Sequence, residues 1–370
     1  MTSSYLEPIV LALNRNQKQL NSLASSGNKI IGYFCTYTPV EVIDACGFIP
    51  VRITGGAGDV EKAYSLIPDF VCPFMKRSLE KALLGEYAFL SGVIQGYTCD
   101  IACGVTNIWE NNIKGDLYHT LPLPYIDSPE SRKYFRSNIK TMIVKLNEAS
   151  GHFSEEALWD SIKVYSRIRE LVEELYVKRK KGKSPLNSQD LWYINQAVAT
   201  IPPRDCLVLL EELLTGIKNI EGIQADGIPI LISGSLIEAP DVFKSLEECG
   251  GKVVEDDLCT GIRAFSPASG EGKDPIDQIM DRHFKRFPCP SRAKAEDRFE
   301  HIKGLIAESG ARGVIFLPQK FCAPHLSDIP FLSERLKEEN IPTIVIEMDE
   351  TWQTEGQFKT RLEGFFEMLR

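Results

Sequence analysis

Three cysteines lie where a parallel-sheet fold would place reactive thiols. Cys99 and Cys322 each follow a short apolar run, in the segments GVIQGYTC and GVIFLPQKFC. Because ligands gather outside the carboxyl ends of strands in open α/β sheets, two such cysteines can face one cleft. Cys72, in DFVCPFMKRS, precedes a helical pattern, and a helix dipole would stabilise its thiolate there. Three thiols at one cleft would suit the binding of a metal or a cluster.

Three thiolates can hold a [4Fe–4S] cubane through three of its irons, and the fourth iron then stays open. An open iron can bind a substrate oxygen as a Lewis acid. A simpler interpretation stands beside this one, because a cysteine after a strand is commonly just a small buried residue. The sequence contains no CxxCxxC run, so the residues alone leave both interpretations open.

The other seven cysteines divide by their positions in the sequence. Cys103 follows Cys99 by four residues and is a weaker ligand candidate, and Cys35 follows an apolar run and is expected to line the cleft. Cys259 follows a strand pattern, and Cys289 stands between prolines in a rigid loop. Three cysteines in helical patterns are expected in the core: Cys46, Cys206 and Cys249.

Two other chemistries fit some of the same residues. A structural zinc site would use paired ligands at short spacing, and Cys322 with His325 has that form. A nucleophilic cysteine needs a nearby base, and Cys322 or Cys99 could use His325 or His119. No oxyanion motif accompanies the Cys–His pairs, so a nucleophilic cysteine is disfavoured.

The composition excludes several classes of function. A net charge of −9 disfavours general nucleic-acid binding. There is no run of about 18 apolar residues to cross a membrane, and the N-terminal segment lacks the pattern of a signal peptide. We therefore expect a cytoplasmic protein without nucleic-acid or membrane partners, in which the ten cysteines are reduced.

The hydrophobic pattern predicts an α/β fold with two Rossmann-like (flavodoxin-like) parallel-sheet domains and a helical segment between them. Apolar runs predict strands at residues 29–34, 49–53, 91–96, 117–124, 228–235, 251–258, 313–318 and 341–348. Helical patterns separate many of these runs, and the middle of the chain has helical spacing with no convincing strand. We expect an N-terminal α/β domain over residues 1–150, a helical segment over 151–225 and a C-terminal α/β domain over 226–370.

Seven segments occur in an order that is typical of one family: GYFCTYTPVEVIDACGFIPVRI, FVCPFMKRSLE, GVIQGYTCD, VVEDDLCTGIRAF, FPCPSR, GVIFLPQKFCAPH and GQFKTRLEGFFEML. They resemble the (R)-2-hydroxyacyl-CoA dehydratase and benzoyl-CoA reductase family, in particular its smaller beta or C-type subunits. The resemblance covers nearly the whole chain. It implies one [4Fe–4S] cluster held by three cysteines, which match Cys72, Cys99 and Cys322, and it identifies no catalytic side chain. Ser235 stands where relatives with a double cubane have cysteine, so a single cubane is expected.

The same resemblance implies the activity and the partners. It implies an acyl-CoA substrate, a related second subunit in a hetero- or homodimer, and a separate ATP-hydrolysing iron–sulfur activator. No G-x-x-x-x-G-K-[ST] loop occurs here that could bind ATP phosphates. In a dehydratase the injected electron makes a ketyl radical anion, hydroxide leaves from C2, and the electron is recycled. In a benzoyl-CoA reductase the electrons stay in the product.

We therefore expect the iron–sulfur subunit of an (R)-2-hydroxyacyl-CoA dehydratase, which is an oxygen-sensitive lyase. The alternatives are a subunit of a benzoyl-CoA reductase that reduces an aromatic thioester, and a cluster-bearing electron carrier without a substrate. A metal-free α/β binding protein is the weakest alternative.

Further residues have both a functional and an ordinary interpretation. Four cations surround Cys289 and could hold CoA phosphates or form a solvated helix end: Lys285, Arg286, Arg292 and Lys294. TYTPVE predicts a helix start in the cleft with Thr38 as N-cap and Glu41 at the third position. Trp109 and Trp352 are expected near strand ends, where each could shield a cluster or simply pack. The basic run 177–183 suggests a solvated turn, with partner docking as its alternative.

Overall fold

Two parallel four-stranded sheets organise the chain in the computed structural model, which describes residues 3–180, 184–220, 222, 226–349 and 355–370. The strands of the two sheets are β1 (Ile30–Tyr33), β2 (Ile49–Arg52), β3 (Gly92–Gly96) and β4 (Leu117–Leu121), then β5 (Ile228–Gly234), β6 (Gly251–Asp257), β7 (Gly313–Leu317) and β8 (Thr343–Val345). The strand order is β2-β1-β3-β4 in the first sheet and β6-β5-β7-β8 in the second. The second sheet therefore repeats the topology of the first.

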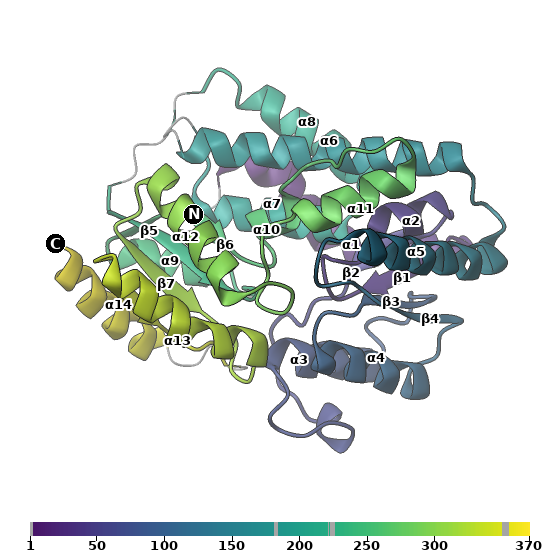
Figure 1. The fold of residues 1–370 in the computed structure, drawn as a ribbon, viewed down its shortest axis with the longest axis horizontal. Helices are drawn as coiled ribbons and strands as arrows, with labels where there is room; N and C mark the ends of the chain where they lie inside the picture. Colours follow the sequence, from purple (N-terminus) through teal and green to yellow (C-terminus); the bar gives the residue numbers. More distant parts are fainter. Residues whose placement is uncertain (1–2, 181–183, 221, 223–225, 350–354) are drawn as a thin grey trace.

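Helices cover both sheets and form a layer between them (Figure 1). Those of the first half are α1 (Glu7–Ser25), α2 (Val40–Ala45), α3 (Pro73–Leu83), α4 (Asp100–Asn112), α5 (Pro129–Ser150) and α6 (Glu155–Lys180). The later helices are α7 (Ser188–Thr200), α8 (Pro203–Gly216), α9 (Asp241–Glu248), α10 (Ile262–Phe265), α11 (Pro275–Lys285), α12 (Ala295–Ser309), α13 (Ala323–Glu338) and α14 (Glu355–Leu369). Two short 3₁₀ helices are η1 (Ser4–Leu6) and η2 (Ala63–Ser65).

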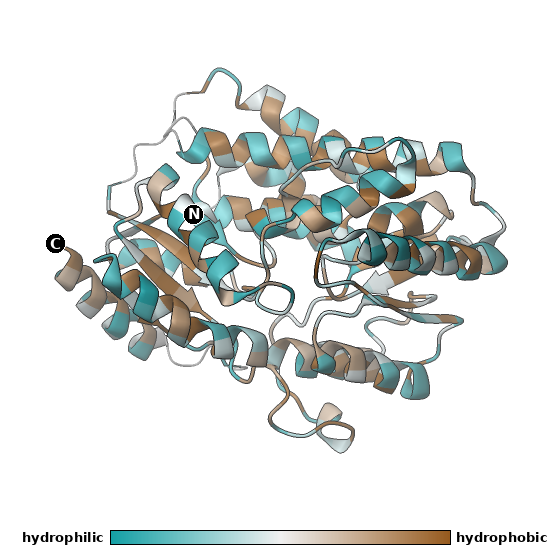
Figure 2. Ribbon diagram, viewed as in Figure 1, coloured by the Kyte–Doolittle hydropathy of each residue, from teal (hydrophilic) through white to brown (hydrophobic). Residues whose placement is uncertain are grey.

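The strands are apolar on both faces because each sheet is covered on both sides. In the first sheet, Ile30 and Val93 face α3 and α4, whereas their neighbours Ile31 and Ile94 face α2 and α5. The strands accordingly appear hydrophobic in Figure 2, while many of the surrounding helices show a hydrophilic side. The predicted α/β fold with two parallel sheets is confirmed, and each predicted strand is present.

The observed strands are shorter than the predicted runs, most clearly β4 and β8, and a proline accounts for one end of each of these two. The run 117–124 ends as a strand at Leu121, directly before Pro122, and the run 341–348 begins as a strand only after Pro342. Proline has no N–H to donate to a neighbouring strand, so it ends the regular hydrogen-bonded ladder.

The helical middle of the chain joins the two sheets. α6 contacts α2 of the first half and β6 of the second, and it packs along α8. α1, from the N-terminal end, packs against α7, and α11 packs against α5 and α6. The division at residues 150 and 225 remains a prediction, although these helices pack across it. Among the described residues, no helix is both long and apolar enough to cross a membrane.

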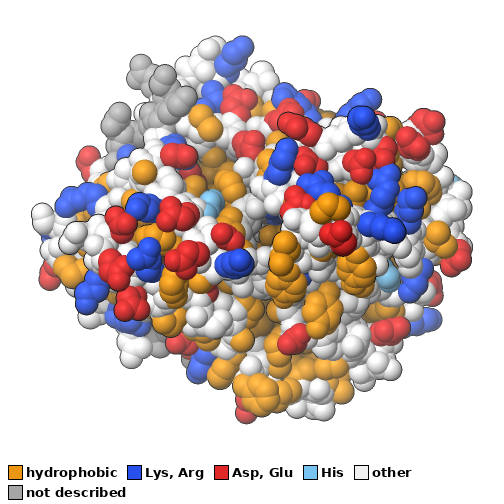
Figure 3. Space-filling model, viewed as in Figure 1, with side chains coloured by type: hydrophobic (Ala, Val, Ile, Leu, Met, Phe, Trp, Pro, Cys, Tyr) orange, Lys and Arg blue, Asp and Glu red, His pale blue; other side chains and the backbone are white. Residues whose placement is uncertain are grey.

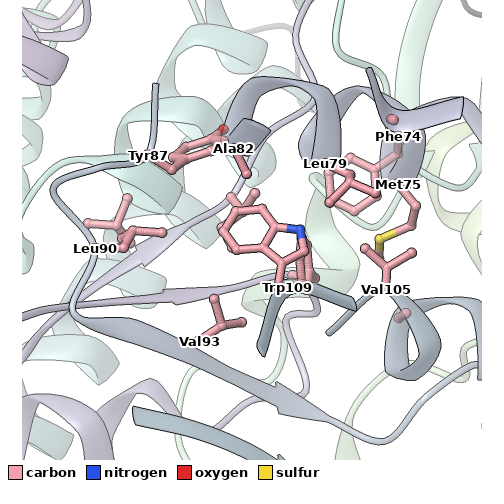
Figure 4. Close-up of a cluster of buried hydrophobic side chains, with 14 of the residues drawn as sticks. Phe74, Met75, Leu79, Ala82, Tyr87, Leu90, Val93, Val105 and Trp109 are labelled. Carbon is pink, nitrogen blue, oxygen red and sulfur yellow. The ribbon is translucent and has the colours of Figure 1, made fainter. Parts of the chain in front are cut away.

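Trp109 lies at the centre of the core between α3, α4 and the first sheet (Figure 4). The sequence places it near a strand end, but it is inside α4, with 1% of its surface exposed. Its ring meets Phe34 edge to face at 5.6 Å and lies 5.8 Å from the ring of Tyr87. Trp109 therefore holds α4 on the sheet as a packing residue. Trp352, its proposed counterpart, is outside the described residues.

Replacing Trp109 should test this packing role directly. Trp109→Ala should lower the free energy of unfolding by about 3–5 kcal/mol, because it opens a large cavity that the rigid strands cannot fill. Urea unfolding followed by circular dichroism measures the change. Leu84→Ala, at an exposed position beside the same core, should cost less than about 0.5 kcal/mol. Equal losses in the two variants would contradict this account.

Candidate functional site

The three candidate cysteines occupy the same position in three different helices. Cys72 is the N-cap residue of α3, Cys99 of α4 and Cys322 of α13. All three are half-buried. A helix N-terminus carries partial positive charge and free amide groups, so each thiol stands where a negative sulfur is favoured.

The fold brings these three thiols into one electrostatic neighbourhood. Burial raises the pKa of Cys322, and the nearby thiols of Cys72 and Cys99 raise it further. Burial also raises the pKa of Cys99 to about 12, and Cys72 contributes to that rise. The three residues come from both halves of the chain, so the site lies between the two sheets.

The described residues contain no group of three His, Cys, Asp or Glu side chains that could hold one metal ion. That finding concerns ligands that converge on a single point. In a cubane each thiolate binds a different iron, so the ligands surround a cage instead. Three cysteines at three separate helix ends fit the second kind of donor set.

The position of the site follows from the strand order. In each sheet the chain adds its first two strands in one direction and the next two in the other. The direction changes between β1 and β3 in the first sheet and between β5 and β7 in the second. Ligands in open α/β sheets bind at such switch points. Cys35 and Cys99 follow β1 and β3, and Ser235 and Cys322 follow β5 and β7. Both switch points therefore contribute residues to the neighbourhood of the three candidate cysteines.

Gln319 connects the two halves beside the candidate ligands. It follows β7, and its side-chain oxygen accepts a hydrogen bond at 3.0 Å from the amide of Phe74 in the first turn of α3. Its own backbone amide donates to the Ser235 hydroxyl at 3.3 Å. This contact fixes the start of α3, and hence Cys72, against the loop that leads to Cys322. Sequence reasoning missed it, although a glutamine after a wholly apolar strand was a usable signal.

Two more buried side chains fix the loops of the cleft. The side-chain oxygen of Gln95 accepts hydrogen bonds from the amides of Phe34 and Cys35 at 3.2 and 3.1 Å. Arg52 donates to the carbonyl of Phe34 at 3.1 Å and to that of Cys259 at 3.3 Å. Arg52 therefore joins the end of the first sheet to the loop after β6.

The remaining cysteines lie largely where the sequence predicts. Cys259 lies near Cys35 and Cys289, and its sulfur is 3.8 Å from an amino group of Arg263. Cys103, in the first turn of α4, is an electrostatic neighbour of Cys99. The three cysteines expected in the core are buried there: Cys46, Cys206 and Cys249.

A buried network of charges supports the second half of the cleft. Asp257, at the end of β6, is fully buried and pairs with Arg263 at 3.0 Å and with Arg298 at 2.9 Å. Arg298 also binds Asp328 of α13 at 2.6 Å. Although burial opposes it, the two arginines hold the pKa of Asp257 well below its usual value. α10, α12 and α13 are thereby fixed around one carboxylate.

One predicted helix start is wrong in detail. α2 begins at Val40 with Pro39 as its N-cap, so Thr38 does not cap it. The Thr38 hydroxyl accepts a hydrogen bond from the amide of Gly96 at 3.1 Å instead. Glu41 is buried and pairs with Arg169 of α6. Thr38 and Glu41 therefore connect the start of α2 to β3 and α6 instead of capping the helix.

The basic residues predicted around Cys289 divide into two groups. Arg286, Arg292 and Lys294 line a pocket of about 670 Å³, whereas Lys285 points outward and pairs with Asp281 at 3.0 Å. Of the basic run 177–183, residues 181–183 lie outside the described residues, and Lys180 pairs with Glu255 at 2.8 Å.

The two candidate bases are both buried histidines. Burial lowers the pKa of His119, which lies in β4, to about 4. Burial also lowers the pKa of His325, in α13, well below its usual value. Both imidazoles are therefore neutral at pH 7. Cys322 accepts a hydrogen bond from the backbone amide of His325, and no described hydrogen bond joins a cysteine to an imidazole, so the nucleophile hypothesis gains no support.

Comparison with known proteins places these residues in context. The family model "2-hydroxyglutaryl-CoA dehydratase, D-component" matches residues 35–369. The beta subunit of (R)-phenyllactyl-CoA dehydratase from Clostridium sporogenes is 26% identical over 95% of this chain and 94% of its own. A subunit of benzoyl-CoA reductase from Thauera aromatica is 26% identical, covering 87% of this chain and 86% of its own. The beta subunit of (R)-2-hydroxyglutaryl-CoA dehydratase from Acidaminococcus fermentans is 26% identical, covering 93% of both chains.

The raised thiol pKa values predict an unusual pH profile of alkylation. Burial raises the pKa of Cys72 from 9.0 to about 11, while the amide of Met75 and the ammonium of Lys76 oppose the rise. At pH 8 the reactive thiolate fraction should then be about a hundredfold lower than at a pKa of 9. In the metal-free chain, the rate of iodoacetamide labelling at Cys72 should keep rising up to about pH 11. Mass spectrometry of the labelled peptide measures it, with glutathione as control, and levelling off near pH 9 would contradict it.

Proposed function

The chain belongs to the 2-hydroxyglutaryl-CoA dehydratase D-component family, and from that premise we propose that it is the iron–sulfur subunit of an (R)-2-hydroxyacyl-CoA dehydratase. The observation that carries the proposal is the meeting of Cys72, Cys99 and Cys322 at three helix N-termini between the two sheets. Relatives that are dehydratase beta subunits align with more than nine tenths of the chain and so support it.

We propose that these three cysteines hold one [4Fe–4S] cluster. When bound, such a cluster supplies one-electron transfer and an open iron for a substrate oxygen. The chain's own task is to provide three thiolates in fixed positions. Because burial keeps the free thiols protonated at pH 7, metal binding must release their protons. The helix N-termini then stabilise the negative sulfurs that result.

We propose that a second, related subunit lies over the mouth of this site. Exposed aromatic side chains stand next to each candidate ligand: Phe70 precedes Cys72, Tyr97 precedes Cys99, and Phe321 directly precedes Cys322. Figure 3 shows apolar side chains gathered on the lower part of one face. Exposed aromatic patches of this kind are typical of protein–protein interfaces, and a cover would exclude water and oxygen from the site.

We propose that the energy for reduction comes from a third protein. A thioester carbonyl is hard to reduce, and the sequence has no phosphate-binding G-x-x-x-x-G-K-[ST] loop. An ATP-hydrolysing iron–sulfur activator would therefore have to deliver the electron. A specific observation also favours a second function: the benzoyl-CoA reductase relative is as similar to this chain as the dehydratase subunits are.

Replacing the candidate ligands should remove the iron. Cys72→Ser, Cys99→Ser and Cys322→Ser should each lose most of the metal from anaerobically purified protein, which should otherwise hold about four irons per chain. Iron analysis and visible absorption measure the loss. Cys46→Ala and Cys206→Ala are the controls, because these cysteines are buried in the core, and they should retain the iron. Retention of iron in all three ligand variants would show that the ligand assignment is wrong.

Turnover should depend on an activator and should separate the two candidate reactions. The chain with its partner subunit should be inactive with ATP and a mild reductant, and should become active when the iron–sulfur ATPase is added. In a dehydratase one activation should support many turnovers, because the electron is returned in each cycle. In a reductase, ATP hydrolysis should follow product formation throughout. Turnover without any ATPase would refute activation by electron injection.

A further inference from the structure

A pocket of about 670 Å³ lies beside the cysteine cleft, between the segment after β4 and the loop that joins α11 to α12. We call it the α11–α12 pocket. Its walls combine aromatic rings, of Tyr37 and Tyr125, with the cations of Arg286, Arg292 and Lys294. It is wide enough for a sizeable polar ligand.

Two buried guanidinium groups of this pocket have unused hydrogen-bonding capacity. Arg286 and Arg292 are each only 7% exposed, and the Nε of each is buried without a partner. Arg286 donates to the backbone and hydroxyl oxygens of Thr36, and Arg292 to the carbonyls of Tyr97 and Pro124. Neither forms an ion pair with a carboxylate of the described chain. Buried cations of this kind favour an anionic ligand.

The same arginines present flat surfaces. The guanidinium of Arg286 lies 4.2 Å from the centre of the Tyr37 ring, and that of Arg292 lies 4.0 Å from the Tyr125 ring. Beside them, the side chain of Ile126 is largely exposed. Stacked arginine and aromatic planes are suited to a planar ring such as a nucleobase.

The N-terminus of α12 supplies a third feature. Lys294 is its N-cap residue and makes no capping hydrogen bond, so no side chain closes this helix end. Free amides and the helix dipole at such an end favour a phosphate group. Asp127, which also lines the pocket, is paired with Arg132 at 2.6 Å, whereas Asp297 lines the pocket and forms no ion pair with another described residue. Cations thus outnumber the one uncommitted carboxylate.

We propose that the α11–α12 pocket binds the adenosine-phosphate end of a CoA thioester in this subunit itself. The phosphates would meet Lys294, Arg286 and Arg292, and the base would lie against Tyr125. Cys35 and Cys289 are electrostatic neighbours of both arginines, and Cys35 is also a neighbour of Cys99. A ligand anchored here by its nucleotide can therefore extend its thioester toward the cysteine cleft. The proposal rests on the proposed function, because it takes a CoA thioester as the substrate.

Calorimetric titration of the full-length, anaerobically purified chain tests this site without requiring turnover. The probes are CoA, ADP and pantetheine, which lacks the nucleotide. CoA should bind, and Lys294→Gln should weaken it roughly tenfold, because a charge-assisted phosphate contact is lost. Asp297→Asn should tighten CoA binding roughly twofold to fivefold by removing a like charge. Both substitutions are at exposed positions, so both variants should fold.

The matched control is Lys285→Gln, which removes an exposed lysine nearby that points away from the pocket. It should leave CoA affinity unchanged, and pantetheine binding should be insensitive to all three substitutions. Equal CoA affinity in Lys294→Gln, Asp297→Asn and the parent chain would overturn the proposal. So would binding of ADP that depends on Lys294 while CoA does not bind, which would indicate a site for free nucleotides.

Failure here is distinct from failure of the proposed function. A chain that holds iron and turns over with its partners, yet shows no effect of Lys294 on CoA binding, would place the nucleotide elsewhere. A chain that binds CoA as expected but holds no iron would leave the pocket intact and refute the cluster.

Discussion

Concentrated positive charge between the two sheets is the constraint on which the site depends. α3, α4 and α13 begin at three cysteines that are electrostatic neighbours of one another. Four buried arginines around them make no ion pair with any carboxylate that the structure describes: Arg52, Arg282, Arg286 and Arg292. Burying charge without a counter-charge is costly. Anions in this region would offset that cost, and thiolates and ligand phosphates have the required charge.

The protein provides opposing charge within its fixed framework, but leaves the cleft itself positive. Asp257, at the end of β6, neutralises Arg263 and Arg298, and Glu41 of α2 neutralises Arg169 of α6. Those ion pairs orient helices, and their charges are neutralised within the protein. The four buried arginines without an ion pair instead donate hydrogen bonds to backbone carbonyls, which fix their position and leave their charge without a counter-charge. The arginines that hold the framework together are thus paired with carboxylates, whereas those available to a ligand are bound to carbonyl oxygens.

Much of this arrangement could be predicted from the sequence, because it depends on local patterns. Apolar runs marked the strands, and cysteines directly after two of them marked the inner ends of β3 and β7. The contacts across the cleft could not be predicted in this way. Gln319 accepts a hydrogen bond from an amide of α3 that lies 245 residues earlier in the chain, and Thr38 bonds to β3 rather than to its own helix. The sequence around Trp109 would be the same whether this residue packed in the core or shielded a cluster. Only the tertiary structure shows that it packs in the core.

The spacing of the candidate ligands along the chain has a consequence for biosynthesis. Cys72 and Cys99 lie among the elements of the first sheet, but Cys322 follows β7 of the second. A ribosome-bound chain that has completed the first sheet therefore carries two of the three thiols and no finished cradle. A cluster held by these three cysteines, as we propose, could therefore be inserted only after the second sheet has folded against the first. The proteins that deliver such a cluster would then have to recognise a folded apoprotein rather than a nascent segment.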